Sequence, residues 1–451
     1  MTEALLGIDV GTTLCKAAVV SLDGRELAHG RRPTPWRSVP TGAEADPADL
    51  VAAAQGAAED ALAAARTDRV IAVGVTSMAE TGVLSDGRGR PVAPAIAWYD
   101  RRGDAEASAL GAALPGSSFS ARAGLPVSAL CSAVKLRWLR EHVPSAREGR
   151  RWLSVAEWVV RRLGGDEVAE RSLAARTGLF DQQAGDWWPE MIDWAGWPAS
   201  LVPEPVAAGT PAGRVDGSLS AARGALLTVA GHDHLCAAVG AGAIEDGDVL
   251  DSCGTAEALI AARGGRLDED RVAAAVASGL AVGEHVLPGR QAVLAGFPAG
   301  LVLARFRDLL GVAPDATSDL DAAALAAGGA GGLSVEDMTA GRARIVGVGP
   351  GASPGALWCA AVEALAGHGA AVLGEIERFT GPSGRVVLTG GWGRSAALLA
   401  AKQRRLGALV CPPVSEAAAR GAALAGGCAA GVYASIAAVP RPVASGAEAS
   451  G

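Results

Sequence analysis

The sequence predicts an α/β protein made of two halves, each with a strand, a Gly-Thr turn and a second strand. Two stretches carry this pattern, "GIDVGTTLCKAAVV" at 7–20 and "GDVLDSCGTAEALIA" at 247–261. The chain has 451 residues, and this length suggests two or three domains of roughly 100–200 residues each. Half of the residues are hydrophobic and 20% are charged, which is the composition of a folded globular protein.

The first half opens with a predicted β-hairpin. Apolar runs at 5–10 and 14–20 flank "GTT", and a turn signal, "LDGRE", follows them. The Asp-Pro pair at 46–47 supplies an N-cap and a proline at the first helical position, so we expect a helix to about residue 66. Its apolar residues are spaced for one buried face. A buried strand is expected at 69–76.

The second half begins near residue 227, after a Pro/Gly-rich connection at 201–213. The stretch 385–407 predicts a strand, a glycine turn and a helix whose N-cap region holds Ser395. The sequence "EAAARGAALAGGCAAGVY" predicts a final helix. We place an N-terminal domain at 1–228 and a C-terminal domain at 229–436. The tail at 437–451 is rich in Pro, Ala, Ser and Gly, and we expect it to be disordered.

Charge and aromatic content argue against a nucleic-acid or membrane partner. The net charge of -8 disfavours a polyanion-binding surface. The tryptophans at 150–200 could form an aromatic platform for nucleic acid, but the many acids there favour packing of an extra helical layer. No uninterrupted apolar segment is expected to span a bilayer. The crowded tryptophans are Trp152, Trp158, Trp187, Trp188, Trp194 and Trp197.

Cysteine usage predicts a reduced, cytoplasmic protein. The seven cysteines are scattered and form no Cys-x-x-Cys pair, so neither a disulfide framework nor a zinc site is indicated. The start "MTEALLGIDV" lacks the basic and apolar regions of a signal peptide.

The first Gly-Thr turn has the residues of a phosphate site. A tight turn at Gly11 points several backbone N–H groups into one concavity, which suits phosphate oxygens, and the hydroxyls of Thr12 and Thr13 could add donors. Asp9 could hold Mg²⁺, through water, because Mg²⁺ keeps much of its hydration shell. Lys16, one of only three lysines, could place a positive charge near a terminal phosphate. A plain surface hairpin with a capping aspartate is the alternative.

Two further glycine segments extend this interpretation to a nucleotide. Gly254 and Thr255 could form a second phosphate nest facing the first, so that the two clamp a polyphosphate. Gly390 and Gly391 would let the backbone lie close to a flat ligand such as adenine or its ribose, at a helix N-terminus. A Rossmann fold would need G-x-G-x-x-G between a strand and a helix, but here the first turn runs into a second strand.

These segments together resemble the FGGY family of carbohydrate kinases, in the actin, hexokinase and heat-shock-70 superfamily. "GIDVGTTLCKA" and "SCGTAEAL" are similar to the two phosphate motifs, and "VVLTGGWGRS" and "EAAARGAALAG" to the adenosine region. The segment 75–102 resembles the sugar-binding segment, whose ending is carried by Trp98, Asp100 and Arg102. "VSALCSAVKLRWLREHVP" resembles a family helix containing Lys135, and "VAGHDHLCAAVGAG" the segment of the catalytic aspartate, here Asp233.

The resemblance implies two ribonuclease-H-like domains with an interdomain cleft. It implies ATP and Mg²⁺ as cofactors and a sugar or polyol as the substrate, such as a xylulose- or fuculose-like ketose. Asp233 would accept the proton of the attacking hydroxyl, with Asp9 organising Mg²⁺. Trp98 would wall the sugar pocket, although packing in the core is the alternative. A homodimer is one assembly that the sequence leaves open.

Glu80 departs from the pattern of the family's xylulose kinases. Their comparable segment tends to read Gln-Met-His-Gly, whereas this chain has "MAET" at 78–81. That is closer to the Arg-Glu-Thr of glycerol kinases, although Ala79 replaces the arginine. A carboxylate in the pocket could accept hydrogen bonds from two vicinal hydroxyls. The alternative is a salt bridge to Arg101 or Arg102. Ketopentoses, deoxy-ketoses and small polyols therefore stay open as substrates.

The sequence "GHDH" allows a metal-binding alternative. In a strand, His232 and His234 would point to one face and Asp233 to the other, so one site would not collect all three. We expect both histidines to shape the site or to donate hydrogen bonds. Other functions also stay open. An ATP-binding regulator of the same fold is one, although its iron–sulfur branch would need a cysteine pair and a repressor would need a helix-turn-helix extension. A pseudokinase is another.

Overall fold

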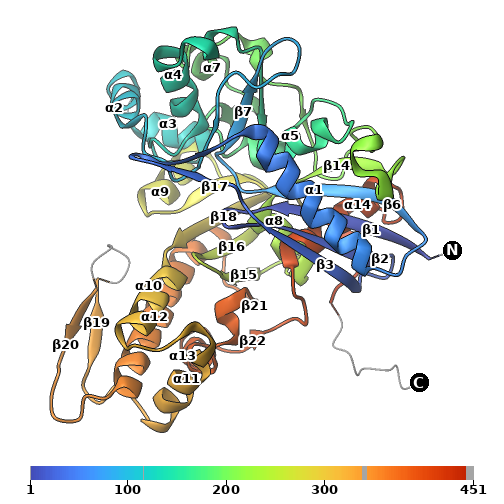
Figure 1. The fold of residues 1–451 in the computed structure, drawn as a ribbon. Helices are drawn as coiled ribbons and strands as arrows, with labels where there is room; N and C mark the ends of the chain where they lie inside the picture. Colours follow the sequence, from blue (N-terminus) through green and yellow to red (C-terminus); the bar gives the residue numbers. More distant parts are fainter. Residues whose placement is uncertain (1, 115, 338–342, 443–451) are drawn as a thin grey trace. The chain divides into compact units, whose positions relative to one another are not determined.

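The computed structural model describes residues 2–114, 116–337 and 343–442 (Figure 1). The chain divides into two compact units. Unit 1 contains residues 1–244, 262–292 and 414–451, and unit 2 contains residues 245–261 and 293–413. These units do not follow a single cut between residues 228 and 229, because the chain returns twice to unit 1. The predicted domain boundary stays a prediction.

Unit 1 is built on a five-stranded sheet of order β14-β6-β1-β2-β3. The predicted hairpin is confirmed, since β1 pairs with β2 and β2 with β3 in antiparallel fashion. On the other side, β1, β6 and β14 run parallel, and almost every residue of β1 is buried. The strands are β1 (Glu3–Val10), β2 (Leu14–Ser21), β3 (Glu26–Pro33), β6 (Arg69–Ser77) and β14 (Leu226–His232).

Two helices cover opposite faces of this sheet. Helix α1 (Pro47–Ala64) packs on the face that includes Leu6 and Ile8 of β1, and α14 (Ala417–Ala429) lies on the other face (Figure 1). The backbone of α14 touches the sheet directly. A Cβ atom added at Gly7 would lie 1.7 Å from the Ala419 carbonyl oxygen. Glycine is therefore required where this helix crosses β1, and both predicted helices are confirmed.

Asp46 caps α1 as the sequence predicts, with its Oδ1 accepting a hydrogen bond from the Ala48 N–H at 2.8 Å. We expect Asp46→Ala to lower the free energy of unfolding by about 1 kcal/mol, because the helix loses a partner for one of its free N–H groups. Asp46→Asn keeps an acceptor and should stay close to wild type. Chemical denaturation of the three proteins checks this prediction, and equal losses for both variants would contradict it.

The remaining elements of unit 1 include the segment rich in tryptophan. Trp152, Trp158, Trp188 and Trp197 are buried, which confirms that they pack the protein interior. The other helices and strands are β4 (Arg37–Val39), β5 (Gly42–Ala45), β7 (Gly82–Ser85), β8 (Ala95–Ile96), α2 (Asp104–Ala113), α3 (Gly116–Ala123), α4 (Ser132–His142), β9 (Arg151–Ser154), α5 (Val155–Arg162), β10 (Ala169–Glu170), α6 (Arg171–Ala174), β11 (Phe180–Asp181), β12 (Asp186–Trp187), α7 (Pro189–Trp194), β13 (Pro205–Val206), α8 (Asp233–Ala241), α9 (Glu269–Ala277) and β17 (Ala281–Glu284).

Unit 2 repeats the same arrangement of a hairpin beside parallel strands. The second Gly-Thr segment joins β15 and β16, which pair antiparallel, and β21 and β22 extend the sheet from β15 in parallel fashion. The predicted strand, Gly-Thr turn and strand is thus present in each half. The neighbouring strands are β18 (Arg290–Phe297), β16 (Glu257–Gly264), β15 (Asp248–Cys253), β21 (Arg385–Thr389) and β22 (Leu409–Val410).

The helices of unit 2 include one long apolar helix. Helix α12 (Pro354–Thr380) is long and apolar enough to cross a membrane by length and composition alone, contrary to the expectation that no segment would be. However, 56% of its apolar window is buried inside the protein, as in a core helix, so it is weak evidence for a membrane span. The other elements are α10 (Ala299–Leu309), α11 (Thr317–Ala326), β19 (Ser334–Glu336), β20 (Arg344–Val346) and α13 (Ala396–Leu406).

The first part of the predicted disordered tail is ordered. Residues Ile436–Ala438 form a 3₁₀ turn, and Val439 is buried. The Arg420 Nη2 donates to the Pro440 carbonyl oxygen at 2.9 Å. For 437–442 the prediction was therefore wrong, because this segment packs on the buried guanidinium of α14. Residues 443–451 lie outside the described residues.

Candidate active site

The first Gly-Thr turn presents unpaired backbone donors. The Gly11 N–H donates to the Leu14 carbonyl oxygen at 3.1 Å, which closes the turn between β1 and β2. Among the described residues, the amide N–H groups of Thr12 and Thr13 form no hydrogen bond. Free amides in a tight turn attract anions, so the geometry fits the predicted phosphate nest.

Two tryptophans and a threonine donate hydrogen bonds to this turn. The Trp98 Nε1–H donates to Thr12 Oγ1 at 2.9 Å, and the Trp36 Nε1–H donates to the Thr12 carbonyl oxygen at 2.7 Å. The Thr34 hydroxyl donates to the Gly11 carbonyl oxygen at 2.7 Å. Trp98 is also packed against the core of unit 1. The predicted sugar-binding segment is thus bonded directly to the predicted phosphate turn.

Asp9 and Asp233 lie at the same edge of the sheet. Val10 of β1, Ser77 of β6 and His232 of β14 are partners across the three parallel strands, so the carboxyl ends of β1 and β14 flank that of β6. Burial, and then the Asp233 carboxylate, raise the pKa of Asp9. The structure therefore brings together the two acidic residues that the sequence singles out.

The two histidines lie beside Asp233, contrary to the expectation from strand geometry. Strand β14 ends at His232 and α8 begins at Asp233, so side chains do not alternate across a strand here. One ligand atom from each of His232, Asp233 and His234 lies within 4.8 Å of the others. The prediction that one site would not collect all three was wrong. His232 does donate a hydrogen bond, with its Nε2 3.1 Å from Asp233 Oδ1.

These neighbours keep the Asp233 carboxylate ionised. Burial alone would raise the pKa of Asp233, but the His234 and His232 side chains and the hydrogen bonds to the carboxylate lower it. The His234 backbone N–H donates to Asp233 Oδ1 at 2.7 Å. Both hydrogen bonds thus engage Oδ1, and Oδ2 accepts none from any residue that the structure describes.

Lys16 faces Asp9 across the hairpin. The two residues are direct partners in the β1–β2 register, and the Lys16 Nζ lies 3.0 Å from Glu416 Oε2. Burial opposes the charge of Lys16, but Asp9 and Glu416 raise its pKa. Glu416 is 4% exposed and also accepts from Arg31 Nε at 2.7 Å. The sequence analysis missed Glu416, although an acid opening the final helix was a signal that could have indicated it.

The surroundings of Asp9 fit a bound cation. Its Oδ1 is buried and has no hydrogen-bond partner among the described residues, and a second carboxylate, Asp233, lies close enough to raise its pKa. An orphaned carboxylate oxygen beside a second acid is a donor set that Mg²⁺ and its bound waters can satisfy. Asp9 would hold the ion.

Glu80 forms an ion pair with a residue from a distant part of unit 1. The Arg176 Nη2 and Nε lie 2.5 and 2.7 Å from Glu80 Oε1, so the partner is neither Arg101 nor Arg102. The two side chains are 13% and 17% exposed. The backbone of Glu80 is left-handed, with φ at 60°. This conformation is uncommon for a residue other than glycine and gathers at functional sites.

Asp100 and Arg102 form a buried network. Asp100 is fully buried and accepts from Arg102 Nε at 3.0 Å and from its Nη2 at 2.9 Å, while Arg102 Nη1 donates to Glu44 Oε2 at 2.9 Å. Lys135 Nζ donates to the carbonyl oxygens of Ala97 and Trp98, both at 2.9 Å. These groups fix the backbone of the sugar-binding segment, and substrate contact by Asp100 and Arg102 stays a prediction.

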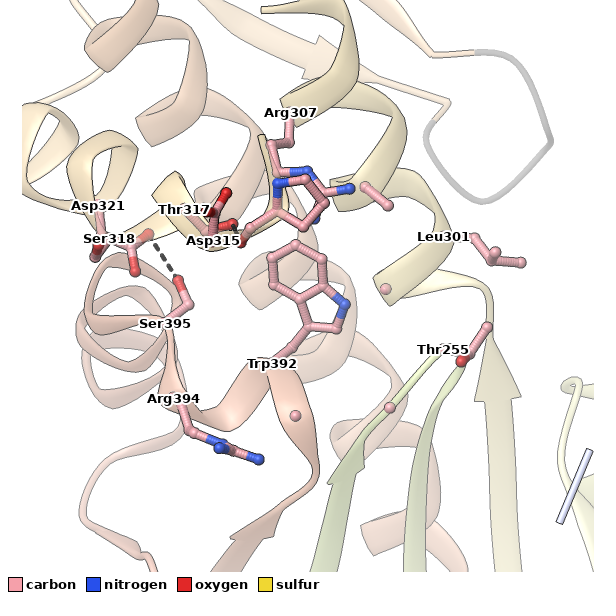
Figure 2. A pocket seen from close by; sticks show the side chains of 15 residues that line it. Thr255, Leu301, Arg307, Asp315, Thr317, Ser318, Asp321, Trp392, Arg394 and Ser395 are labelled. Atoms are coloured by element: carbon pink, nitrogen blue, oxygen red, sulfur yellow. Dashed lines mark hydrogen bonds between the residues drawn. The ribbon is translucent and has the colours of Figure 1, made fainter. Parts of the chain in front are cut away.

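Unit 2 contains a cavity of about 700 Å³. It is lined by Gly254 and Thr255 of the second Gly-Thr turn and by Gly391 and Trp392 of the glycine segment (Figure 2). Gly390 packs against the backbone of Cys253, which precedes the second Gly-Thr turn, and an added Cβ would be 2.3 Å from the Cys253 carbonyl oxygen. The structure therefore brings together two segments more than a hundred residues apart in the chain.

Asp321 organises the far side of this cavity. Its Oδ1 accepts from Ser395 Oγ at 2.8 Å (Figure 2) and from Trp358 Nε1 at 2.8 Å, and its Oδ2 accepts from the Ala396 N–H at 2.9 Å. It thereby supports the predicted cap of α13, where Ser395 accepts from the Leu398 N–H. The sequence analysis missed Asp321, because a single acid in an alanine-rich helix carries no motif.

Comparison with known proteins decides the family. Residues 4–240 match the model described as the FGGY family of carbohydrate kinases, N-terminal domain. The chain belongs to this family of kinases. The glycerol kinase of Acidovorax ebreus (strain TPSY) is 30% identical over 96% of this chain and 91% of that protein. The glycerol kinase of Leptothrix cholodnii (strain ATCC 51168 / LMG 8142 / SP-6) is also 30% identical, over 95% of this chain and 91% of its own.

Solved structures show the same fold. The xylulose kinase from Rhodospirillum rubrum is 27% identical with a TM-score of 0.82, covering 95% of this chain and 90% of that chain. The glycerol kinase of Plasmodium falciparum with ADP has a TM-score of 0.86 at 17% identity, covering 98% and 93%. The predicted two-domain α/β fold is confirmed. This kinase is a phosphotransferase that acts on an alcohol group of a sugar or polyol, and its family implies ATP as a substrate.

Proposed function

We propose that this kinase transfers the γ-phosphoryl group of Mg-ATP to one hydroxyl of a small polyol or a ketose, with Asp233 as general base. The observation that carries the proposal is the Asp233 carboxylate beside Asp9, of which only one oxygen is bonded within the described residues. Its Oδ1 is held by the His232 ring and the His234 amide, and its Oδ2 is open to a substrate hydroxyl.

An ordinary ionised carboxylate is sufficient for this chemistry. Phosphoryl transfer passes through a loose transition state in which positioning and charge neutralisation supply most of the rate. The attacking hydroxyl donates a hydrogen bond to Asp233 Oδ2. Its proton moves to that oxygen as the new oxygen–phosphorus bond forms and the bond from the γ-phosphorus to the ADP leaving group breaks. The hydrogen bonds to Oδ1 keep the carboxylate in one orientation for this transfer.

Contacts to the nucleotide are assigned within each unit by itself. In the proposal, Thr12 and Thr13 bind phosphate oxygens with their free amides, and Lys16 supplies a positive charge. Gly254 and Thr255 bind phosphate from unit 2. The cavity beside Gly391, with Gly390 behind it, receives the nucleoside.

Asp9 would hold the magnesium ion. When bound, Mg²⁺ neutralises charge on the phosphate oxygens. The residue's own contribution is a buried carboxylate with one unpartnered oxygen. Lys16 lies opposite Asp9 in the hairpin, so a positive charge from the protein is present at the same edge of the sheet.

Glu80 and Arg176 support a substrate with vicinal hydroxyls. A carboxylate accepts and a guanidinium donates hydrogen bonds, so the pair can bind adjacent hydroxyl groups in a fixed order. The relatives are named glycerol kinases and xylulose kinases, which agrees with a small polyol or a ketose such as a xylulose- or fuculose-like sugar. Trp98, Asp100 and Arg102 complete the assigned segment. The cytoplasmic location and a homodimer stay predictions.

A coupled assay of ADP release across polyols, ketoses and aldoses tests the proposal. We expect at least one polyol or ketose to stimulate ADP release well above the rate with ATP alone. Glu80→Gln should raise the KM for that acceptor more than it changes the KM for ATP, because an amide cannot accept from two hydroxyls as a carboxylate does. If no member of the panel stimulates ADP release, the ATP-binding regulator becomes the better interpretation.

A further inference from the structure

The hydroxyl of Thr12 lies in an unusual hydrogen-bonding environment. It accepts from the Trp98 indole N–H at 2.9 Å, and this is its one hydrogen bond among the described residues. The Thr12 carbonyl oxygen accepts separately from the Trp36 indole N–H. Two indole N–H groups therefore donate to Thr12, one to its side chain and one to its backbone.

This arrangement decides what the Thr12 hydroxyl can do. A hydroxyl has one donor proton and two acceptor lone pairs. Since Trp98 occupies a lone pair and an indole N–H only donates, the proton of Thr12 must be given elsewhere. The Thr12 hydroxyl forms no second hydrogen bond with any residue described here. The proton is thus available to solvent or to a ligand that displaces it, on the same turn as the free amides of Thr12 and Thr13.

The position of Trp98 is itself fixed. Its carbonyl oxygen accepts from the buried ammonium of Lys135 at 2.9 Å, as does that of Ala97, and Lys135 is 1% exposed. The indole meets the Tyr99 ring edge to face with centroids 5.5 Å apart. The backbone at Trp98 is thus tied to α4, and the indole ring is held by its packing on the core and its contact with Tyr99.

We propose that Trp98 is a positioning residue. Its indole N–H orients the Thr12 hydroxyl so that this hydroxyl donates a hydrogen bond to a phosphate of the nucleotide. This rests on the assignment of the first Gly-Thr turn to phosphate in the proposed function. It adds that the segment assigned to the sugar or polyol also orients a hydrogen-bond donor, the Thr12 hydroxyl, toward the nucleotide. The chemical class of the ligand is a nucleoside di- or triphosphate.

A double-mutant cycle on nucleotide affinity tests this proposal. Trp98→Phe keeps the aromatic face and removes the N–H, and Thr12→Val keeps the shape and removes the hydroxyl. We expect each change to weaken binding of Mg-ADP by about two- to tenfold, the value of one net hydrogen bond. In the Thr12→Val background, Trp98→Phe should then have little further effect. Isothermal titration calorimetry with Mg-ADP measures all four proteins.

Controls separate this role from a loss of packing. Trp197→Phe also removes a buried indole N–H, which donates to the Leu136 carbonyl oxygen, and it should leave ADP affinity unchanged. Thr12→Ser restores a hydroxyl and should restore affinity, a readout that holds even if Trp98→Phe folds poorly. Equal losses from Trp98→Phe with and without the Thr12 hydroxyl would overturn the proposal. Absence of Mg-ADP binding by the wild type would instead overturn the proposed function.

Discussion

Replacing Asp233 with asparagine is expected to lower the rate of phosphoryl transfer by roughly 100- to 10,000-fold, the usual contribution of a general base. Asparagine keeps the size of the side chain and one carbonyl oxygen near His232, but it cannot take up the proton of the attacking hydroxyl. Binding of Mg-ADP should persist, because the Gly-Thr turns do not depend on this carboxylate. Steady-state kinetics and calorimetry on the same preparation check both parts.

Asp23→Asn is the matched control, since Asp23 is an exposed aspartate paired with Arg25. It should retain wild-type kinetics. Because His234 and His232 lower the pKa of Asp233, the base stays ionised at neutral and mildly acidic pH, and its titration should not limit the rate there. Near-normal turnover by Asp233→Asn would exclude the assigned role.

Replacing Lys402 with methionine is expected to lower the free energy of unfolding by about 3–5 kcal/mol, because two buried carboxylates lose their positively charged partner. Lys402 is fully buried, and its Nζ lies 2.5 Å from Asp251 Oδ2 and 2.6 Å from Glu257 Oε1. These acids flank the second Gly-Thr turn from β15 and β16. Chemical denaturation at a fixed pH measures the loss.

The loss should depend on pH in a definite direction. Burial, and then Asp251, raise the pKa of Glu257 even with Lys402 present, and removing the ammonium should raise it further. A carboxyl whose pKa is raised in the folded state gains stability as pH falls. The deficit of Lys402→Met should therefore be larger near about pH 8 than near about pH 5.

A compensated variant provides the control for this network. Combining Lys402→Met with Asp251→Asn and Glu257→Gln removes the buried charges together, and most of the lost stability should return, since neutral groups carry a smaller desolvation cost. If the triple variant is no more stable than Lys402→Met alone, charge compensation by Lys402 is not what stabilises this part of unit 2.

Local features of the fold could be predicted from the sequence. The hairpin around the first Gly-Thr turn, the Asp46 cap and the Ser395 cap each depend on residues within a few positions of one another. Turn and cap chemistry acts over that range. Asp9 was also identified, because it ends the strand before the first Gly-Thr turn, and Asp233 was identified from the resemblance of its segment to a family motif.

Contacts between distant segments could not be predicted in the same way. Glu80 meets Arg176 across 96 residues, and Lys402 meets Asp251 across 151 residues. No periodicity or turn signal encodes such pairs.

The histidines were misplaced for a different reason. An apolar run does not show where a strand ends, and here β14 ends one residue before Asp233.

The most direct test of the account is ³¹P NMR of the kinase with Mg-ATP and the acceptor that best stimulates ADP release. The account predicts a phosphomonoester resonance that grows in step with ADP, and no such resonance when Asp233→Asn replaces the wild type. Inorganic phosphate as the sole new product, formed equally with and without the acceptor, would contradict it.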